Sequence, residues 1–222
     1  MREIRGISVL ETLEEIADPR HTALLVIDIQ NDNASPRGIL ALNGVDISAV
    51  RTILPAVKSV LEAARRLGLL IVFMRNTRSR DGSQESGPLM RGRERQHTRG
   101  LAGYVLEGTW GNEVLEELEP RQNERQMIKY RPSAFIGTPL DLLLKNKQTK
   151  SAVVVGQGTP WCVETTVRDL EQYGYYPVVL SDCVCTADRR ELHQASLLVM
   201  SDRYVVVTSG ELLKVWNSKK EA

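Results

Sequence analysis

Three polar residues in this chain combine a nucleophile, a proton acceptor and a cation. Asp28, Lys129 and Cys162 each follow a short apolar run of the sequence. A thiol attacks a carbonyl carbon as the thiolate, which a nearby cation and a helix N-terminus both stabilise. A carboxylate beside it can take up the thiol proton and pass it to a departing amine. Together the three residue types predict nucleophilic acyl transfer.

Taken one at a time, these residues have simpler explanations. An Asp that ends an apolar strand commonly caps a loop, a single Cys near a helix start is commonly a small buried hydrophobe, and a single Lys is commonly solvated. The position of all three at predicted strand ends favours catalysis. The turn at residues 156–159, Gly-Gln-Gly-Thr, adds backbone N–H groups that could hold an oxyanion.

The elements that must position these residues alternate along the chain. Short apolar runs predict strands at residues 23–27, 69–74, 126–130, 152–156, 177–180 and 204–207. Helical spacing and caps predict helices at residues 50–64, 112–118, 138–146, 159–173, 189–200 and 209–216. Residues 1–20 are expected to form an N-terminal arm, and residues 31–44 a loop.

Strands that alternate with helices predict parallel pairing through right-handed crossovers. We therefore expect one domain over residues 1–222, a three-layer α/β/α fold of the Rossmann-like kind around an open, mostly parallel six-stranded sheet. Ligands of such sheets bind beyond the carboxyl ends of the strands, where Asp28, Lys129 and Cys162 would meet.

Composition excludes several classes of protein. The 222 residues carry a net charge of +1 and are 42% hydrophobic, and no apolar run approaches the ~20 residues that span a bilayer. Balanced charge and only two Phe disfavour nucleic acid as a partner, and the charged start disfavours a signal peptide, so we expect a cytoplasmic protein. Three Cys and three scattered His favour neither a disulfide framework nor a zinc site.

Three motifs in order give the chain a resemblance to the isochorismatase-like, or cysteine hydrolase, superfamily. The first surrounds Asp28, the second Lys129 and the third Cys162. They are Leu25-Val-Ile-Asp-Ile-Gln-Asn-Asp32, Ile128-Lys-Tyr-Arg-Pro-Ser-Ala-Phe135 and Val154-Val-Gly-Gln-Gly-Thr-Pro-Trp-Cys162. A weaker fourth match covers residues 174–182, and the resemblance runs from about residue 22 to residue 208.

The resemblance implies a role for each residue. Asp28 would be the general base, Lys129 its cationic partner and Cys162 the nucleophile, with the backbone N–H groups of Gly158 and Cys162 as the oxyanion hole. It also implies a cis peptide bond between Gln157 and Gly158, and a homodimer or homotetramer.

Two departures from the resemblance bear on the chemistry. Pro160-Trp161 stands where relatives have Asp or Asn and a small apolar residue. The metal-binding pattern of the nicotinamidase branch is missing after the second strand, so we expect no metal and no cofactor.

The presence of Cys162 at the nucleophile position favours C–N hydrolysis. The alternatives are isochorismatase-type vinyl-ether hydrolysis, which would release pyruvate, and a non-catalytic scaffold with a closed pocket or an unreactive thiol.

Within the superfamily, the chain most resembles the branch of ureidoacrylate, biuret and N-carbamoyl amidohydrolases. This resemblance rests on the sequence of the loop 37–46 and on the residues around Trp110. This implies a small amide, ureido or carbamoyl substrate. Asn76, Trp110, Phe135 and Trp161 are candidates for the pocket wall. Residues 75–99 hold a run of arginines, of which one or two could bind an anionic substrate, although surface or subunit salt bridges are the preferred interpretation: Arg75, Arg78, Arg80, Arg91, Arg93, Arg95 and Arg99.

Overall fold

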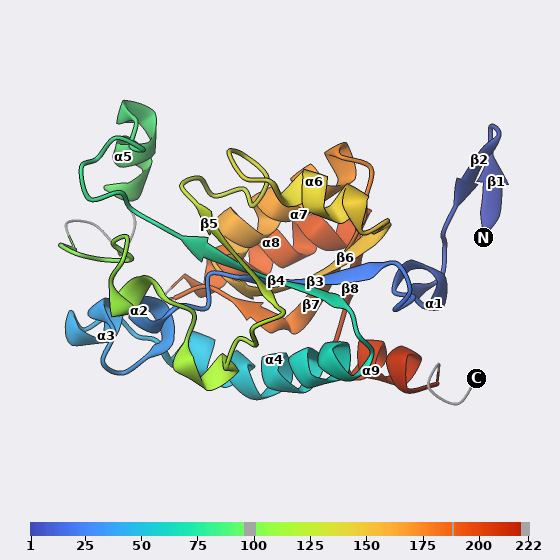
Figure 1. The fold of residues 1–222 in the computed structure, drawn as a ribbon, viewed down its shortest axis with the longest axis horizontal. Helices are drawn as coiled ribbons and strands as arrows, with labels where there is room; N and C mark the ends of the chain where they lie inside the picture. Colours follow the sequence, from blue (N-terminus) through green and yellow to red (C-terminus); the bar gives the residue numbers. More distant parts are fainter. Residues whose placement is uncertain (96–100, 188, 219–222) are drawn as a thin grey trace.

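The computed structural model describes residues 1–95, 101–187 and 189–218. Its centre is one sheet of six strands in the order β5-β4-β3-β6-β7-β8 (Figure 1), and every neighbouring pair is parallel. The strands are β3 (Thr22–Ile27), β4 (Leu70–Asn76), β5 (Arg125–Lys129), β6 (Ser151–Gln157), β7 (Tyr176–Cys185) and β8 (Val205–Val207). The predicted open α/β sheet is confirmed.

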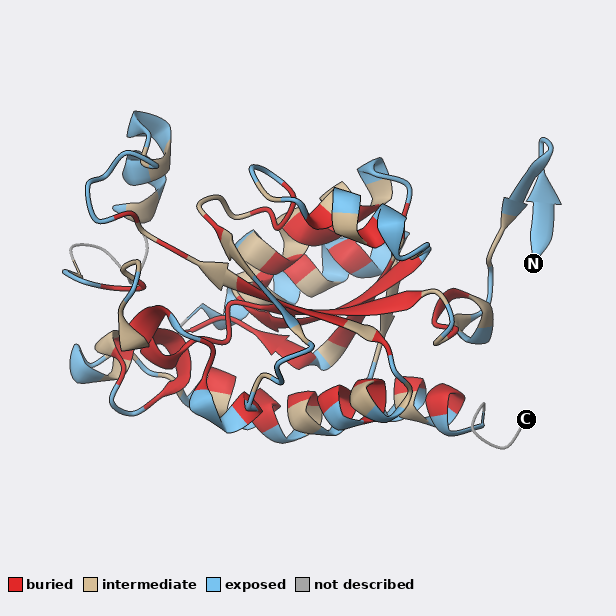
Figure 2. Ribbon diagram, in the orientation of Figure 1, coloured by how far each residue is buried: buried red, intermediate tan, exposed pale blue. Residues whose placement is uncertain are grey.

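Helices cover both faces of this sheet. Figure 1 shows α4 and α9 along one face and α6, α7 and α8 along the other. Their bounds are α4 (Ser48–Arg66), α6 (Leu140–Asn146), α7 (Glu164–Gln172), α8 (Arg190–Arg203) and α9 (Ser209–Ser218). Alternate residues of β3 enter the two apolar cores, Leu24 on the α4 side and Leu25 on the α7 side. Figure 2 shows the central strands buried, as expected where helices lie on both faces.

The change in strand order beside β3 creates the crevice in which ligands of such sheets bind. From β3 the chain passes first to β4 on one side and only later to β6 on the other, which makes the carboxyl ends of β3 and β6 a topological switch point. Gly156 lets these two strands close up, because a Cβ at this position would lie 2.1 Å from the carbonyl oxygen of Ile27. The residues that follow the two strands are therefore brought together.

The N-terminal arm has two parts. A hairpin of β1 (Arg2–Ile4) and β2 (Ile7–Val9) projects from the body (Figure 1), and its residues are largely exposed (Figure 2). The following helix α1 (Leu13–Ile16) lies against the body, where the Trp216 indole N–H donates to the carbonyl of Ala17 at 2.9 Å. In the part of the chain that the structure describes, no helix is long and apolar enough to cross a membrane.

The segments after β3 and β4 are more ordered than their sequences indicate. The expected loop at 31–44 contains two short helices, and the stretch after β4 contains a third. These are α2 (Asn31–Ala34), α3 (Ile39–Leu42) and α5 (Gly87–Arg93). Asp32 joins the segments, because its carboxylate accepts the backbone N–H of Ile39 at 3.1 Å and of Val105 at 2.7 Å.

The helix expected at 112–118 is absent. That region instead forms two 3₁₀ turns, η1 (Trp110–Asn112) and η2 (Glu116–Leu118). Gly111 lies so close to Asp32 that a Cβ would meet its carboxylate at 2.3 Å. The local path is therefore fixed by a distant carboxylate rather than by helical periodicity.

Candidate active site

Asp28 stands just beyond β3 in an unusual backbone conformation. Its φ of 54° lies in the left-handed region, which non-glycine residues adopt rarely and chiefly where surrounding contacts impose it. Two contacts hold it there. Its N–H donates to the carbonyl of Met74 at 2.9 Å, and its own carbonyl accepts the Asn33 side-chain amide at 2.8 Å.

Lys129 ends β5 and reaches across β4 to Asp28. Its ammonium lies 2.9 Å from Oδ2 of Asp28 and donates to the carbonyl of Arg131 at 3.2 Å. The other carboxylate oxygen, Oδ1, accepts the N–H of Asn76 at 3.0 Å. The Lys129 side chain is 0% exposed. A buried charge is tolerable only when paired and hydrogen-bonded, so each of these ions depends on the other.

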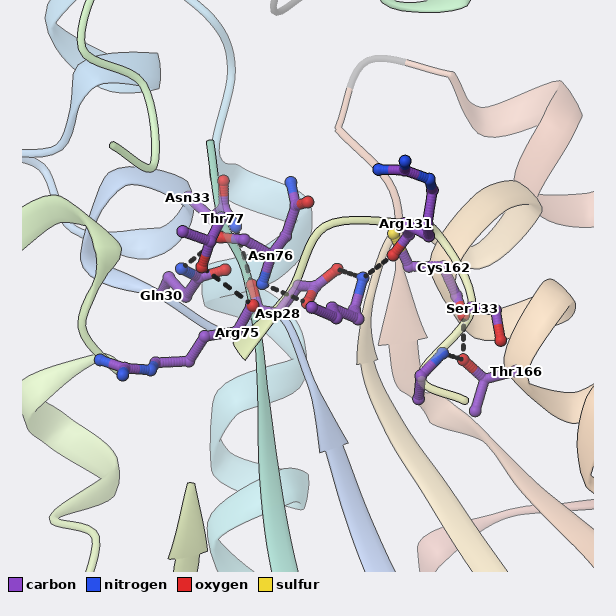
Figure 3. Close-up of polar contacts among 12 residues, drawn as sticks. Asp28, Gln30, Asn33, Arg75, Asn76, Thr77, Arg131, Ser133, Cys162 and Thr166 are labelled. Atoms are coloured by element: carbon purple, nitrogen blue, oxygen red, sulfur yellow. Dashed lines mark hydrogen bonds and ion pairs between the residues drawn. The ribbon is translucent and has the colours of Figure 1, made fainter. Parts of the chain in front are cut away.

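Cys162 lies in a single π-helical turn rather than in the expected first turn of an α-helix. The turn η3 (Thr159–Val163) precedes α7, and Gly158 before it has a φ of 83°. The hydroxyl of Thr166 donates to the carbonyl of Cys162 at 2.6 Å and accepts the N–H of Ala134 at 3.1 Å, which ties the turn to the loop after β5 (Figure 3). Isolated π-turns are frequent at functional sites.

Burial and neighbouring charges determine the resting protonation of Cys162 and Lys129. Burial raises the pKa of the Cys162 thiol to about 12; the Asp28 carboxylate adds to this shift and the Lys129 ammonium opposes it. Burial lowers the pKa of Lys129, but attraction to Asp28 and to the Cys162 sulphur outweighs burial, and its pKa is raised. At neutral pH Cys162 is therefore a thiol and Lys129 a cation. The thiol can attack only after it has given up its proton, and Asp28 is positioned to accept it.

Replacing Asp28 by asparagine is expected to make Cys162 more reactive toward iodoacetamide at about pH 7. The Lys129 cation then has only the sulphur to balance it, so the pKa of Cys162 falls and alkylation accelerates ~10-fold or more. Mass spectrometry of the alkylated protein over a pH series measures this, with Cys162→Ala to identify the labelled residue. Unchanged or slower alkylation would contradict the assigned electrostatics. A slow reaction of the native thiol therefore does not by itself indicate a non-catalytic protein.

The predicted cis peptide bond between Gln157 and Gly158 is wrong. The described residues contain no cis bond. Gly158 turns the chain through its positive φ instead, and its N–H donates to the carbonyl of Cys185 at 2.8 Å, beside the pairing of Gln157 with Cys185. The Gly158 N–H is thus engaged by β7 and not free as an oxyanion donor in this structure. The Cys162 N–H, which lies 3.6 Å from the position a Gly158 Cβ would take, stays a predicted donor.

A cavity of about 550 Å³ opens over these groups. Asp28 and Cys162 line it, as do two of the four candidate wall residues, Asn76 and Trp161. Trp161 is 46% exposed. The volume is in the range of small-molecule sites, and the cavity gives access to the thiol, unlike the closed pocket expected of a scaffold.

The other two candidate wall residues do not line the cavity. Trp110 donates its indole N–H to Glu116 at 2.7 Å beneath the guanidinium of Arg37. Phe135 is buried and stacks on Tyr173 with ring centroids 4.7 Å apart. Both aromatic residues have structural partners of their own, which the sequence could not reveal.

The structure adds lining residues that the sequence reasoning passed over. Asn33 and Tyr104 belong to the cavity wall and are joined by a hydrogen bond of 2.5 Å between the Tyr104 hydroxyl and Asn33 Oδ1. Gln157 also lines it, and its Oε1 is buried without a hydrogen-bond partner. Asn33 ends the polar run that starts at Asp28, and this proximity was the available signal. Tyr104 comes from a stretch with no clear periodicity.

The arginine run divides between the cavity and the surface. Arg78, Arg93 and Arg95 line the cavity, and of these three Arg93 forms the expected kind of salt bridge, with Glu85. Arg189, beyond β7, joins them. Of the remaining members, Arg75 points away from Cys162 (Figure 3), Arg80 and Arg91 do not line the cavity, and Arg99 lies outside the described residues.

The sequence matches one known protein family over most of its length. The isochorismatase domain model matches residues 22–211, which include Asp28, Lys129 and Cys162. The chain belongs to the isochorismatase family. Membership of this family makes the protein a hydrolase. The predicted superfamily is confirmed, while the branch within it is not decided.

Several solved structures share the fold of this chain. A cysteine hydrolase from Pseudomonas syringae pv. phaseolicola is 24% identical with a TM-score of 0.78, covering 90% of this chain and 94% of its own. An isochorismatase family protein from Desulfovibrio vulgaris is 29% identical with a TM-score of 0.73, covering 88% and 98%. A nicotinamidase/pyrazinamidase from Bacillus subtilis is 26% identical with a TM-score of 0.69, covering 84% and 99%.

Proposed function

We propose that this protein is a metal-independent cysteine amidohydrolase that cleaves a C–N bond of a small amide, ureido or carbamoyl compound. The observation that carries the proposal is the buried Asp28–Lys129 pair, set against the Cys162 thiol at the floor of an open cavity. A carboxylate beside a thiol and a cation can accept the thiol proton, and an acyl transfer needs that proton to move twice.

The mechanism has two halves. In the first, Asp28 takes the proton of Cys162 while the sulphur bonds to the carbonyl carbon, and Lys129 stabilises the negative charge near the base. The tetrahedral intermediate collapses to a thioester as Asp28 returns the proton to the departing nitrogen, which leaves as ammonia or an amine. In the second, Asp28 takes a proton from water, whose oxygen attacks the thioester, and Cys162 leaves as a thiol once it is reprotonated.

The rival chemistries are less well supported by these groups. Vinyl-ether hydrolysis by protonation requires no thiol, whereas here the thiol shares a cavity with Asp28 and is influenced by the charges of Asp28 and Lys129. A buried ion pair beside a cavity adds little stability compared with apolar residues, so it is not expected in a scaffold without catalysis. Assembly as a homodimer or homotetramer and metal independence stay part of the proposal.

Purified protein is expected to release ammonia from at least one class in a panel of simple amides, carbamoyl compounds and ureido compounds, and treatment with EDTA is expected to leave the rate unchanged. No metal ion enters the steps above, and within the described residues no group of three or more His, Cys, Asp or Glu is arranged to hold one. A coupled ammonia assay and a pyruvate assay run side by side measure the outcome. Pyruvate without ammonia would establish the vinyl-ether alternative, and loss of activity with EDTA would refute metal independence.

A further inference from the structure

The cavity has a positively charged wall, and one of its members, Arg78, is half-buried. The backbone of Arg78 is fixed just beyond β4, since its N–H donates to the carbonyl of Val105 at 3.0 Å and its own carbonyl accepts the N–H of Glu107 at 2.9 Å. Its guanidinium lies over the ring of Tyr104, 5.0 Å from the centroid. The side chain is therefore held in place rather than free in solvent.

The charge of Arg78 has no partner of its own in the described part of the chain. Its Nε is buried without a hydrogen bond, and the one hydrogen bond of its side chain to a described residue is a 3.5 Å approach of Nη1 to the carbonyl of Leu101. The neighbouring Arg93 is paired with Glu85, whereas no described carboxylate lies within ion-pair distance of Arg78. Burial, and then repulsion by Arg93, lower the pKa of Arg78 despite weaker opposing effects of nearby groups. A half-buried cation kept without a counter-ion is costly, and a bound anion would remove that cost.

Tyr104 places this cation close to the reacting groups. Its ring contacts Arg78, while its hydroxyl bonds to Asn33, whose amide in turn bonds to the carbonyl of Asp28. Burial and the charges of Asp28 and Cys162 raise the pKa of this hydroxyl. One aromatic ring thus separates the guanidinium from the catalytic centre, a spacing that suits the two ends of a single small molecule.

We propose that Arg78 binds a carboxylate of the substrate, so that the amidohydrolase acts on small carboxylic acids whose ureido or amide group lies at Cys162. This inference rests on the proposed function. A guanidinium presents parallel N–H donors that match the two oxygens of a carboxylate. Arg95 and Arg189 are exposed at the same cavity and would raise the local concentration of anions without forming the fixed contact.

The test compares ureido acids with neutral analogues of equal length. Ureidoacetate, ureidopropionate and ureidobutyrate are assayed beside their methyl esters, with native enzyme and with Arg78→Gln, Arg78→Lys and Arg80→Gln. Arg80 is the matched control, since it is an exposed arginine near Arg78 that does not line the cavity. Loss of a charged hydrogen bond is expected to lower kcat/KM for the acids by ~10- to 100-fold, mainly through KM, and to leave the esters within about 2-fold. Arg78→Lys, which keeps the charge without the fork, should fall between.

The outcomes separate this inference from the proposed function. Hydrolysis that depends on Cys162 but shows no preference for acids, or an Arg78→Gln variant that slows acids and esters equally, would overturn the carboxylate site and leave the amidohydrolase standing. If no compound is cleaved, titration calorimetry of ureidopropionate against the Cys162→Ala protein decides: binding that Arg78→Gln abolishes supports the site alone, and absence of binding refutes it.

Discussion

Replacing Cys162 by alanine is expected to lower kcat/KM for the best substrate of the panel by at least ~10⁴-fold, because without the sulphur no thioester can form and the two halves of the reaction lose their shared intermediate. The fold should survive the change. Cys162 is partly exposed to the cavity, and the hydrogen bonds that hold its turn use the backbone carbonyl rather than the thiol. Circular dichroism and thermal unfolding are expected to match the native protein closely.

The control for this substitution is Cys183→Ala. Cys183 is fully buried in the core on the α4 side of the sheet, away from the cavity. Its replacement should cost stability of ~1 kcal/mol and leave kcat/KM nearly unchanged. Mass spectrometry after rapid acid quench should show an acyl adduct on the native protein and none on Cys162→Ala. A Cys162→Ala enzyme with more than a tenth of native activity would eliminate the thioester mechanism.

The sequence was most informative where local pattern and tertiary role agree. The apolar run before Asp28 predicts a buried strand, and β3 is one. The spacing of apolar residues through residues 50–64 predicts the helix α4, and Gly68, at a φ of 70°, follows its end as predicted. The carboxyl ends of parallel strands share one edge, so this pattern also brings Asp28, Lys129 and Cys162 together.

The same reasoning fails where distant groups decide the local path. Asp32 organises the segments after β3 and β4 through bonds to residues seven and 73 positions away, and no periodicity records this. The turn before Cys162 is another case. Gly158 there adopts a positive φ, and its N–H is bonded to Cys185 of β7, a partner that the local sequence does not indicate.

Arg78 is a further cavity residue that its position after a strand could have predicted. It lies two residues beyond the end of β4, at the same edge as Asp28 and Lys129. The arginine run around it resembles a solvated surface when judged by composition alone. Position relative to the strand, rather than the number of arginines, distinguishes the half-buried Arg78 from the exposed members of the run, which are Arg80, Arg91 and Arg95.

Replacing Lys129 by methionine is expected to destabilise the protein by ~3–5 kcal/mol and to abolish turnover. The change leaves the Asp28 carboxylate buried without its cation, and the desolvation penalty of an unpaired ion exceeds the packing that a methionine of similar length restores. Urea unfolding followed by tryptophan fluorescence measures the loss of stability. A variant as stable as the native protein would show that the pair is not buried as described.

The double variant Asp28→Asn/Lys129→Met separates stability from chemistry. Removing both charges is expected to recover most of the lost stability, whereas turnover stays absent because no group can accept the Cys162 proton. Recovery of stability without activity would show that the pair is needed for catalysis and not for the stability of the fold. Recovery of both would refute the role of Asp28 as base.

The pH dependence of unfolding gives an independent check on the same pair. The raised pKa of Lys129 means that the folded state holds this proton more tightly than the unfolded chain, so its contribution is complete below about pH 10 and is lost above it. The raised pKa of Cys162 acts in the same direction from about pH 9 upward. Native stability should therefore fall at alkaline pH. The double variant, which keeps only the thiol, should lose less over the same range, and equal losses would mean that Lys129 does not contribute.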